Sequence, residues 1–379
     1  MDNLTHSLVG VLVAKTGLER LSPYAIAAAV VSANAPDLDL IATVGGRWSY
    51  LEHHRGITHS IVGVAVISLL VTLCFWLLDR LLAKRLQQAP RVKVAGLTVV
   101  CLIATATHPI LDWTNNYGIR PFLPWSDQWY YGDLVFVFDP WLWLLLGGAA
   151  FVVTANSRAR IFVWTILGTI LSATILIAGY LGLPAPDAIS WITIAFWLVG
   201  FALVWLIYRS RPPWLTNEKL ATVALLIVPI YWSGLASLHS RAVDASARRA
   251  VSLSEGEAIV RVSAMPMFGN PFRWQSLAES DRAIYRFTQV LNSTPSESPI
   301  SKRYAKPDLG QVPLVEEASK NENALVFLRF ARFPLARVAG KCPQETVVRF
   351  ADLRYTEPGS SRGPFALEVP VRCPDPPLK

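Results

Sequence analysis

The stretch VAGLTVVCLIATATHPILD, residues 94–112, joins an almost unbroken apolar run to a histidine and an aspartate. Val94–Leu111 has the length of a helix that crosses a lipid bilayer, for which about 20 mostly apolar residues suffice. His108 and Asp112 are one helical turn apart, so both side chains fall on one face of that helix. Because ionisable residues at membrane depth are costly and usually functional, the stretch predicts a spanning helix with a functional pair at its end.

The composition of the whole chain is typical of a membrane protein. Of its 379 residues, 53% are hydrophobic and only 16% are charged, whereas about 25% of the residues of a soluble domain are charged. The first residues lack the basic region of a cleavable signal peptide, so we expect insertion to rely on internal apolar segments. Much of the net charge of +8 falls between these segments, where it indicates topology; we expect membrane lipids, and no nucleic acid, as partners.

Further apolar segments predict a helical bundle. Two shorter segments, Leu8–Leu18 and Tyr24–Ala35, predict a helical hairpin that turns at residues 19–23. The expected spanning helices are Ser60–Leu78, Val94–Leu111, Pro140–Ala155, Ile161–Leu183, Ala188–Tyr208 and Leu220–Leu238. Basic residues gather in alternate loops, including residues 80–93 and 157–160, which we therefore expect to be cytoplasmic. The loops between them and the C-terminal part would then lie on the outer, periplasmic side.

The character of the sequence changes at about His239. No spanning segment follows, and the alternating runs Ala324–Phe330 and Thr346–Phe350 predict short strands. Leu291–Pro307 is rich in Ser and Pro and predicts a loop. We expect an all-α polytopic membrane helical bundle over residues 1–238 and a small C-terminal β-rich extramembrane domain over residues 239–379. Cys342 and Cys373 lie in this second part, where an oxidising compartment would favour a disulfide between them.

Most of the histidines lie near the start of the chain and have acidic residues nearby. Thr58 is a plausible N-cap that would place His59 in the first turn of the next helix. With the expected topology, the ends of four segments that are distant in sequence meet at one face of the membrane. The ligand candidates at these ends are His6, Asp37, Asp39, His54, His59, His108 and Asp112.

Each candidate also has a structural interpretation. His6 and His53 taken singly fit an interfacial and an exposed residue, and His239 reads as structural. Asp37 and Asp39 follow a proline and fit a turn with an N-cap. Arg55 fits either a topology or lipid-headgroup arginine, or a group that binds phosphate and stabilises negative charge. The pair His108 and Asp112, inside an apolar helix, is hardest to explain without a metal.

The joint pattern predicts a metal centre. Mixed imidazole and carboxylate ligands suit Zn²⁺, although Mn²⁺ and Fe²⁺ are alternatives. The number of candidate ligands allows one or two ions, and a pair of ions that share a carboxylate can activate water and hold a phosphoryl group. Arg55 and Asp39 are the candidate catalytic residues beside the ligands.

The blocks Leu4–His6, Pro36–Asp39, His54–Ser60 and His108–Asp112 resemble the family of bacterial inner-membrane metal-dependent hydrolases typified by YdjM. The resemblance covers residues 1 to 200 and implies a multi-pass protein of the inner membrane. That family is distantly similar to zinc-dependent phospholipase C and P1-type nuclease, which hold zinc ions with a His-x-x-x-Asp pair in an all-helical fold.

The more distant resemblance implies roles for individual residues. His108 and Asp112 would match the His-x-x-x-Asp pair, with Asp112 as a bridge between two ions. His59 and either Asp37 or Asp39 would complete the first site, and His6 would contribute to the second. The sequence has no histidine between His108 and His239, which departs from the phospholipase pattern and leaves a third metal site without ligands.

Three functions compete. The first is a metal-dependent hydrolase that acts on a phosphoester, such as a lipid or lipid-linked substrate at the outer leaflet. The second is a non-enzymatic protein whose metal serves structure, sensing or transport; transport is disfavoured because Ile161–Leu183 and Ala188–Tyr208 contain almost no ionisable residues. The third is a membrane anchor for a working C-terminal domain. The sequence leaves the substrate, the metal's identity and the oligomeric state open.

Overall fold

The computed structural model describes residues 1–181, 191–291, 301–340, 346–357, 359 and 365–372. The chain divides into two compact units, each described by itself below. The first contains Met1–Asp39, Arg55–Leu238 and Pro266–Pro271, and the second contains Leu40–His54, His239–Met265 and Phe272–Lys379. Residues 40–54, which the sequence assigned to the membrane part, thus belong to the second unit.

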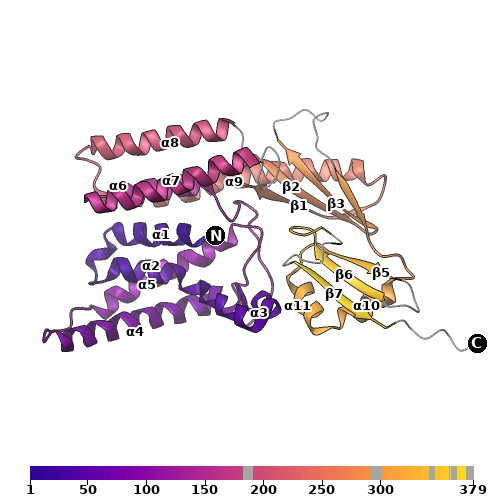
Figure 1. The fold of residues 1–379 in the computed structure, drawn as a ribbon, viewed down its shortest axis with the longest axis horizontal. Helices are drawn as coiled ribbons and strands as arrows, with labels where there is room; N and C mark the ends of the chain where they lie inside the picture. Colours follow the sequence, from indigo (N-terminus) through magenta and orange to yellow (C-terminus); the bar gives the residue numbers. More distant parts are fainter. Residues whose placement is uncertain (182–190, 292–300, 341–345, 358, 360–364, 373–379) are drawn as a thin grey trace, which may run out of the picture. The chain divides into compact units, whose positions relative to one another are not determined.

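Helices form the first unit almost entirely (Figure 1). The helix bounds, with the intervening 3-10 turns labelled η, are α1 Asn3–Lys15, η1 Leu18–Arg20, α2 Ala25–Asn34, η2 Ala35–Gly45, α3 Gly46–His53, η3 Ile57–His59, α4 Ile61–Arg85, α5 Val94–Trp113, α6 Pro140–Thr154, α7 Arg158–Leu181, α8 Trp191–Ser210 and α9 Asn217–Leu253. Of these elements, α3 and the ends of η2 and α9 lie in the second unit.

Six of the described helical segments are long and apolar enough to cross a membrane. They are Ala25–His53, Ile61–Arg85, Val94–Trp113, Arg158–Ile177, Thr193–Ser210 and Asn217–Leu253. The predicted polytopic membrane bundle is therefore confirmed. The expected span Pro140–Ala155 forms the shorter apolar helix α6, which ends at Thr154.

Small residues bring the first two helices close together, as the predicted hairpin requires. Helix α1 packs on α2, α5 and α6 (Figure 1). A Cβ atom added to Gly10 would lie 2.9 Å from the carbonyl oxygen of Ala29 and 3.1 Å from the Cβ of Ala33. Only glycine permits this approach, which is how membrane helices commonly pack. The tight packing fixes the start of α1 relative to the end of α2.

The start of α4 differs from the sequence prediction. Ser60, rather than Thr58, is the N-cap residue, and its hydroxyl accepts a hydrogen bond from the Gly63 N–H. Thr58 and His59 lie in the preceding turn η3 instead of the first helical turn. A competing partner explains the difference, because the Thr58 hydroxyl donates to the Asp39 carboxylate at 3.0 Å.

Two antiparallel sheets, as the β-rich prediction requires, belong to the second unit except for residues 266–271. The strands are β1 Ile259–Met267, β2 Asn270–Ser280, β3 Ala283–Val290 and β4 Lys302–Ala305 in one sheet, and β5 Pro334–Ala339, β6 Thr346–Asp352 and β7 Ala366–Val371 in the other. The prediction of a strand over Thr346–Phe350 is confirmed by β6. Helix α3 packs within this unit on α11, Glu322–Phe330, and α10 spans Val312–Ser319.

Two predictions for this unit are wrong in detail. Ala324–Phe330 forms α11 rather than a strand, because Asn321 caps the helix and the buried Ala324, Phe327 and Phe330 recur with helical spacing. The expected loop Leu291–Pro307 contains β4, which pairs with β3. The predicted disulfide between Cys342 and Cys373 lies outside the described residues.

Asp139 links two helices of the first unit. Its carboxylate accepts hydrogen bonds from the N–H groups of Trp141 and Leu142 at the start of α6, and from the Tyr231 hydroxyl of α9 at 3.0 Å. Burial is the main cause that raises the pKa of Asp139 from 3.8 to about 6. The folded protein therefore binds this proton more tightly than the unfolded chain does, and stability falls as the pH rises from about 4 to about 6.

We expect Asp139→Asn to remove this pH dependence. Asparagine keeps an oxygen for the cap but does not ionise. The melting temperature of the variant, relative to that of wild type, should therefore increase from pH 4 to pH 6 and stay constant above pH 6. Asp139→Ala should instead lose about 2–4 kcal/mol, because the cap disappears and the Tyr231 hydroxyl loses its acceptor. Melting curves in detergent at several pH values check both results. Parallel curves for wild type and Asp139→Asn over the whole range would contradict the role of the buried carboxyl.

Candidate metal centre

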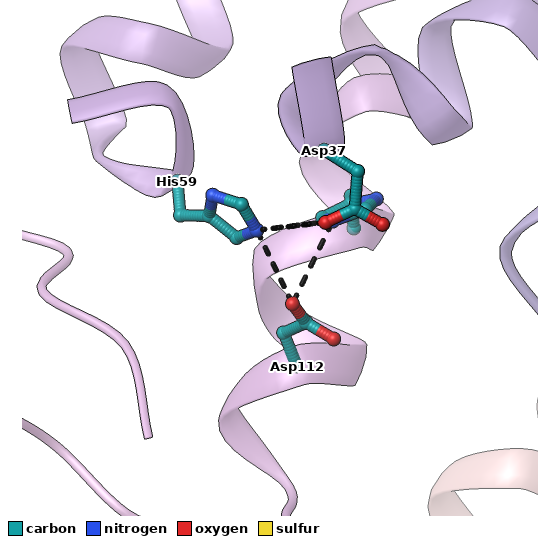
Figure 2. A group of neighbouring side chains, drawn as sticks. Asp37, His59 and Asp112 are labelled. Atoms are coloured by element: carbon teal, nitrogen blue, oxygen red, sulfur yellow. Dashed lines mark hydrogen bonds and ion pairs between the residues drawn. The ribbon is translucent and has the colours of Figure 1, made fainter. Parts of the chain in front are cut away.

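Four side chains from three segments of the first unit meet in one cluster. Asp37 lies in η2, His59 in η3, and His108 and Asp112 in α5. All four are buried, and each offers a ligand atom within 4.8 Å of the others. Figure 2 shows the Asp37 and Asp112 carboxylates directed toward the His59 ring. We call these four residues the Asp/His cluster.

The inward-facing atoms of the cluster lie unusually close together for groups that all carry lone pairs. His59 Nε2 lies 3.2 Å from Asp112 Oδ2 and 3.6 Å from Asp37 Oδ1. His108 Nε2 lies 3.4 Å from Asp37 Oδ1, 3.6 Å from Asp112 Oδ2 and 3.1 Å from His59 Nε2. Two nitrogens and two oxygens thus surround one small volume.

The outer nitrogen of His108 is committed as a hydrogen-bond donor. His108 Nδ1 lies 2.6 Å from the backbone carbonyl oxygen of Ala33, and a carbonyl oxygen can only accept. The proton of the neutral ring therefore sits on Nδ1, and Nε2 presents a lone pair to the cluster. This is how a metal-binding histidine is usually oriented, with its second nitrogen tied to a carbonyl or carboxylate.

His59 is oriented in the same way by a different partner. Its Nδ1 lies 3.0 Å from the Thr58 hydroxyl and 3.4 Å from Asp39 Oδ2. Because the Thr58 hydroxyl donates to Asp39, it accepts from the His59 Nδ1–H. His59 Nε2 is then also a lone-pair atom. Two imidazole lone pairs and two carboxylates facing one another repel, and a bound cation would relieve that repulsion.

Asp39 therefore lies behind His59, on the side away from the centre of the cluster. Its Oδ2 also accepts the Arg55 N–H at 2.9 Å. That bond helps to hold Arg55 in a left-handed backbone conformation, with φ of 53°, which is uncommon for a residue other than glycine. The geometry gives Asp39 the position of an orienting residue.

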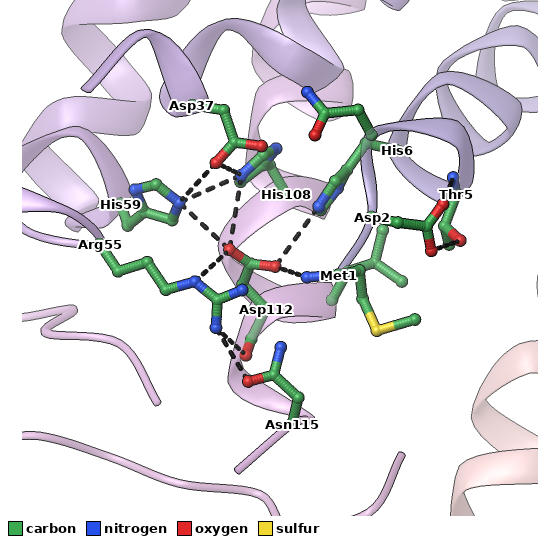
Figure 3. Close-up of polar contacts among 12 residues, drawn as sticks. Met1, Asp2, Thr5, His6, Asp37, Arg55, His59, His108, Asp112 and Asn115 are labelled. Carbon is green, nitrogen blue, oxygen red and sulfur yellow. Dashed lines mark hydrogen bonds and ion pairs between the residues drawn. The ribbon is translucent and has the colours of Figure 1, made fainter. Parts of the chain in front are cut away.

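The Arg55 side chain contacts the cluster at Asp112. Its Nε lies 3.0 Å from Asp112 Oδ2, and its Nη1 donates to Asn115 Oδ1 at 2.8 Å (Figure 3). The guanidinium also lies over the Tyr117 ring, 4.8 Å from the ring centre. Only 5% of Arg55 is exposed, so this charge is neutralised within the protein rather than by lipid headgroups.

His6 reaches the other oxygen of Asp112. Its Nε2 lies 3.4 Å from Asp112 Oδ1, and its ring stacks on that of His108 with the ring centres 3.7 Å apart. Among the described residues, neither ring nitrogen of His6 has a hydrogen-bond partner. The amino group of Met1 contacts the same carboxylate oxygen. Asp112 thus lies between His6 and the two cluster histidines, as a bridging ligand would.

The remaining histidines belong to the second unit. His54 ends α3 in the second unit, so its proposed role as a ligand stays a prediction. His53 is exposed and its Nδ1 lies 2.8 Å from the Ser49 carbonyl oxygen, in keeping with its structural interpretation. His239 packs near the Trp274 ring, also in the second unit.

Some residues of the site carried no clear signal in the sequence. The Ala33 carbonyl is a backbone group and Tyr117 is one aromatic residue among many. Asn115 follows Asp112 by about one turn, a spacing that predicts neighbouring side chains. Thr58 has the composition of a helix cap, but its hydroxyl contacts Asp39 and His59 instead.

We expect Asp39→Ala to weaken metal binding without abolishing it. The change removes the group that holds the Thr58 hydroxyl and the Arg55 N–H, so His59 loses its fixed orientation. Loss of such an orienting partner typically lowers metal affinity by about 10–100-fold. Competition with a chromophoric chelator measures the affinity. Glu52→Ala, which removes an exposed carboxylate, is the control, and equal affinity in both variants would contradict the orienting role.

Together the fold and the site define a class of protein, a polytopic membrane bundle that encloses a buried group of Asp and His that could hold a metal ion. The model of the family described as YdjM inner membrane protein matches residues 1–185, which include every member of the Asp/His cluster. The predicted resemblance to that family is confirmed over these residues. The more distant resemblance to phospholipase C and P1 nuclease stays a prediction.

One curated relative matches about half of the chain. The uncharacterized protein YfhP of Bacillus subtilis (strain 168) is 28% identical to this chain over 194 residues. The match covers 48% of this chain and 52% of the relative, so the chain spans about half the length of the curated protein that it matches. No solved structure matches the chain.

Proposed function

We propose that this protein is a membrane-embedded hydrolase that cleaves a phosphoester with the help of a divalent metal ion. The observation that carries the proposal is the arrangement of the Asp/His cluster. Each of the two imidazoles donates a hydrogen bond from its outer nitrogen and presents the lone pair of its other nitrogen to the two carboxylates. The ligand atoms of all four residues lie within 4.8 Å of one another. Such a mixed set of nitrogen and oxygen ligands suits Zn²⁺.

The residues present fit such an ion, and they comprise residues that would bind it and residues that orient the ligands. Asp37, His59, His108 and Asp112 would hold it, and Asp39 with Thr58 would keep the His59 ring in place. A divalent ion at such a site supplies Lewis acidity and lowers the pKa of a coordinated water. Asp112 has a second oxygen facing His6, which offers a place for a second ion. Arg55 is proposed to position Asp112, since its guanidinium is directed at that carboxylate.

The membrane setting favours a substrate that resides in the bilayer. The match to a family described as an inner membrane protein supports the same location for this chain, and the Lys/Arg pattern favours the periplasmic side for the centre. We therefore propose a lipid or lipid-linked phosphoester, attacked by water, as the substrate class.

Metal analysis combined with turnover tests this function. The full chain, purified in detergent, should contain zinc or a similar ion. It should hydrolyse p-nitrophenyl phosphate or bis(p-nitrophenyl) phosphate, lose that activity with a chelator and regain it with added Zn²⁺. Bound metal without turnover on these esters or on phospholipid would reject the hydrolase and favour a structural or sensing metal site. Purified protein without metal would contradict both functions. Turnover that survives deletion of the residues after His239 would reject the C-terminal domain as the working part.

A further inference from the structure

A large cavity lies between α1, α6, α7 and α8 of the first unit. Its volume is about 670 Å³, which is within the range of small-molecule sites. Leu8, Phe151, Trp164, Phe201 and Trp205 form much of its wall, and no charged residue is among the described residues that line it. The Ser172 hydroxyl on the wall already accepts a hydrogen bond from Trp197, so the cavity suits an apolar ligand.

The cavity runs along α6 at the depth of the membrane. Trp143 and Phe151 both line it, and they are separated by about 12 Å along the helix axis at about 1.5 Å per residue. The α7 and α8 segments that form the opposite wall are candidate membrane spans. The molecules present at this depth are lipids, whose acyl chains are long, narrow and apolar.

The start of α1 contacts the wall of the cavity. The Trp143 indole N–H donates to the carboxylate of Asp2 at 3.2 Å. Asp2 also caps α1 by accepting the Thr5 N–H. The first turns of α1 then direct His6 toward Asp112 and Leu8 into the cavity. The same short helix therefore borders both the cavity and the cluster.

We propose that this cavity holds one acyl chain of a phospholipid whose phosphate reaches the Asp/His cluster. The proposal rests on the proposed function and specifies its substrate class. Since an acyl chain is as well solvated by the bilayer as by the protein, the cavity gains little from the hydrophobic effect. Its role is to select the chain by shape and to place the headgroup.

Gly147 offers a direct way to fill the cavity. It lies on α6 in the cavity wall, and a Cβ atom added there would meet only Leu8 Cδ1, at an ordinary contact distance of 3.7 Å. Gly147→Leu should therefore fit the helix while its side chain occupies the space of the lipid. Gly234→Leu is the matched control, because Gly234 is a glycine of α9 with no atom within 4 Å of the added Cβ.

Native mass spectrometry of the full chain in detergent tests the proposal with dioleoyl and dihexanoyl phosphatidic acid as probes. Wild type and Gly234→Leu should retain the dioleoyl lipid more tightly than the dihexanoyl lipid. Gly147→Leu should weaken dioleoyl binding by at least about tenfold, or about 1.4 kcal/mol. Unchanged dioleoyl binding in Gly147→Leu, or no preference for the long chain in wild type, would overturn the proposal. Selective retention of a polyprenyl phosphate would overturn the acyl assignment.

Two additions keep the result decisive. Ala173→Phe fills the cavity from α7 and should reproduce the loss if Gly147→Leu does not fold. Binding measured after chelation separates this inference from the proposed function. If wild type hydrolyses nothing but the filled variants lose long-chain binding, the lipid site is supported and the hydrolase is rejected. If wild type turns over substrate but both filled variants bind the lipid as wild type does, the hydrolase is supported and the lipid site is rejected.

Discussion

Asp112→Asn is expected to remove metal binding and to reduce phosphoester hydrolysis by at least about 100-fold, since even changes behind the ligands of a metal site cost about 10–100-fold. Asp112 faces His59 and His108 with one oxygen and His6 with the other. Asparagine keeps the shape but lacks the negative charge that a cation requires. It also offers an N–H group where a ligand lone pair is needed.

Elemental analysis and turnover of the purified variant check this result. His53→Ala is the matched control, because it removes an exposed imidazole that lies next to the ligand segment in sequence. We expect full metal content and turnover in that control. Metal content and activity equal to wild type in Asp112→Asn would remove the central ligand from the proposed centre, and with it the hydrolase.

Arg55→Ala should have the largest effect on stability. Arg55 and Asp112 are both buried and lie 3.0 Å apart. Breaking a buried ion pair by removing one partner typically costs about 3–5 kcal/mol, because the other charge is left without compensation. In the metal-loaded protein the cation still neutralises Asp112. The loss of unfolding free energy should therefore be largest after chelation and smaller with bound metal.

Chemical denaturation in detergent, with and without chelator, measures this difference. Arg85→Ala is the control, since Arg85 is exposed at the end of α4 and should cost little in either state. Arg55→Lys should recover only part of the stability, because one ammonium cannot reach both Asp112 and Asn115 as the guanidinium does. An equal loss in the loaded and chelated proteins would show that the cation and Arg55 do not share Asp112.

Most of the helices and the residue types of the Asp/His cluster could be predicted from the sequence because their signals are local. Apolar length predicted five of the six candidate spans, but it missed Ala25–His53 and overestimated the short helix α6. The spacing of His108 and Asp112 predicted a shared helix face. The Lys/Arg rule predicted that His59 and Asp37 lie at the same face of the membrane as this pair, and it did so without using their identities. These predictions depend on period, composition and charge, which the sequence displays directly.

The details of the site depend on three-dimensional partners that the sequence does not display. Thr58 has the composition of a cap, but the Asp39 carboxylate competes for its hydroxyl and Ser60 takes the capping position. Asp39 and Asp37 look equivalent in the sequence, yet they lie on different sides of His59. Ala324–Phe330 is too short for its period to separate a strand from a helix, and its cap and packing decide.

The order of the chain has a consequence for biosynthesis. Every member of the Asp/His cluster, together with Arg55 and Asn115, precedes α6 in the sequence. During translation these groups leave the ribosome before α6, α7 and α8, which line the cavity, and N-terminal parts generally fold first. The proposed metal centre would thus be able to assemble, and to take up an ion, while the remainder of the protein is still being made.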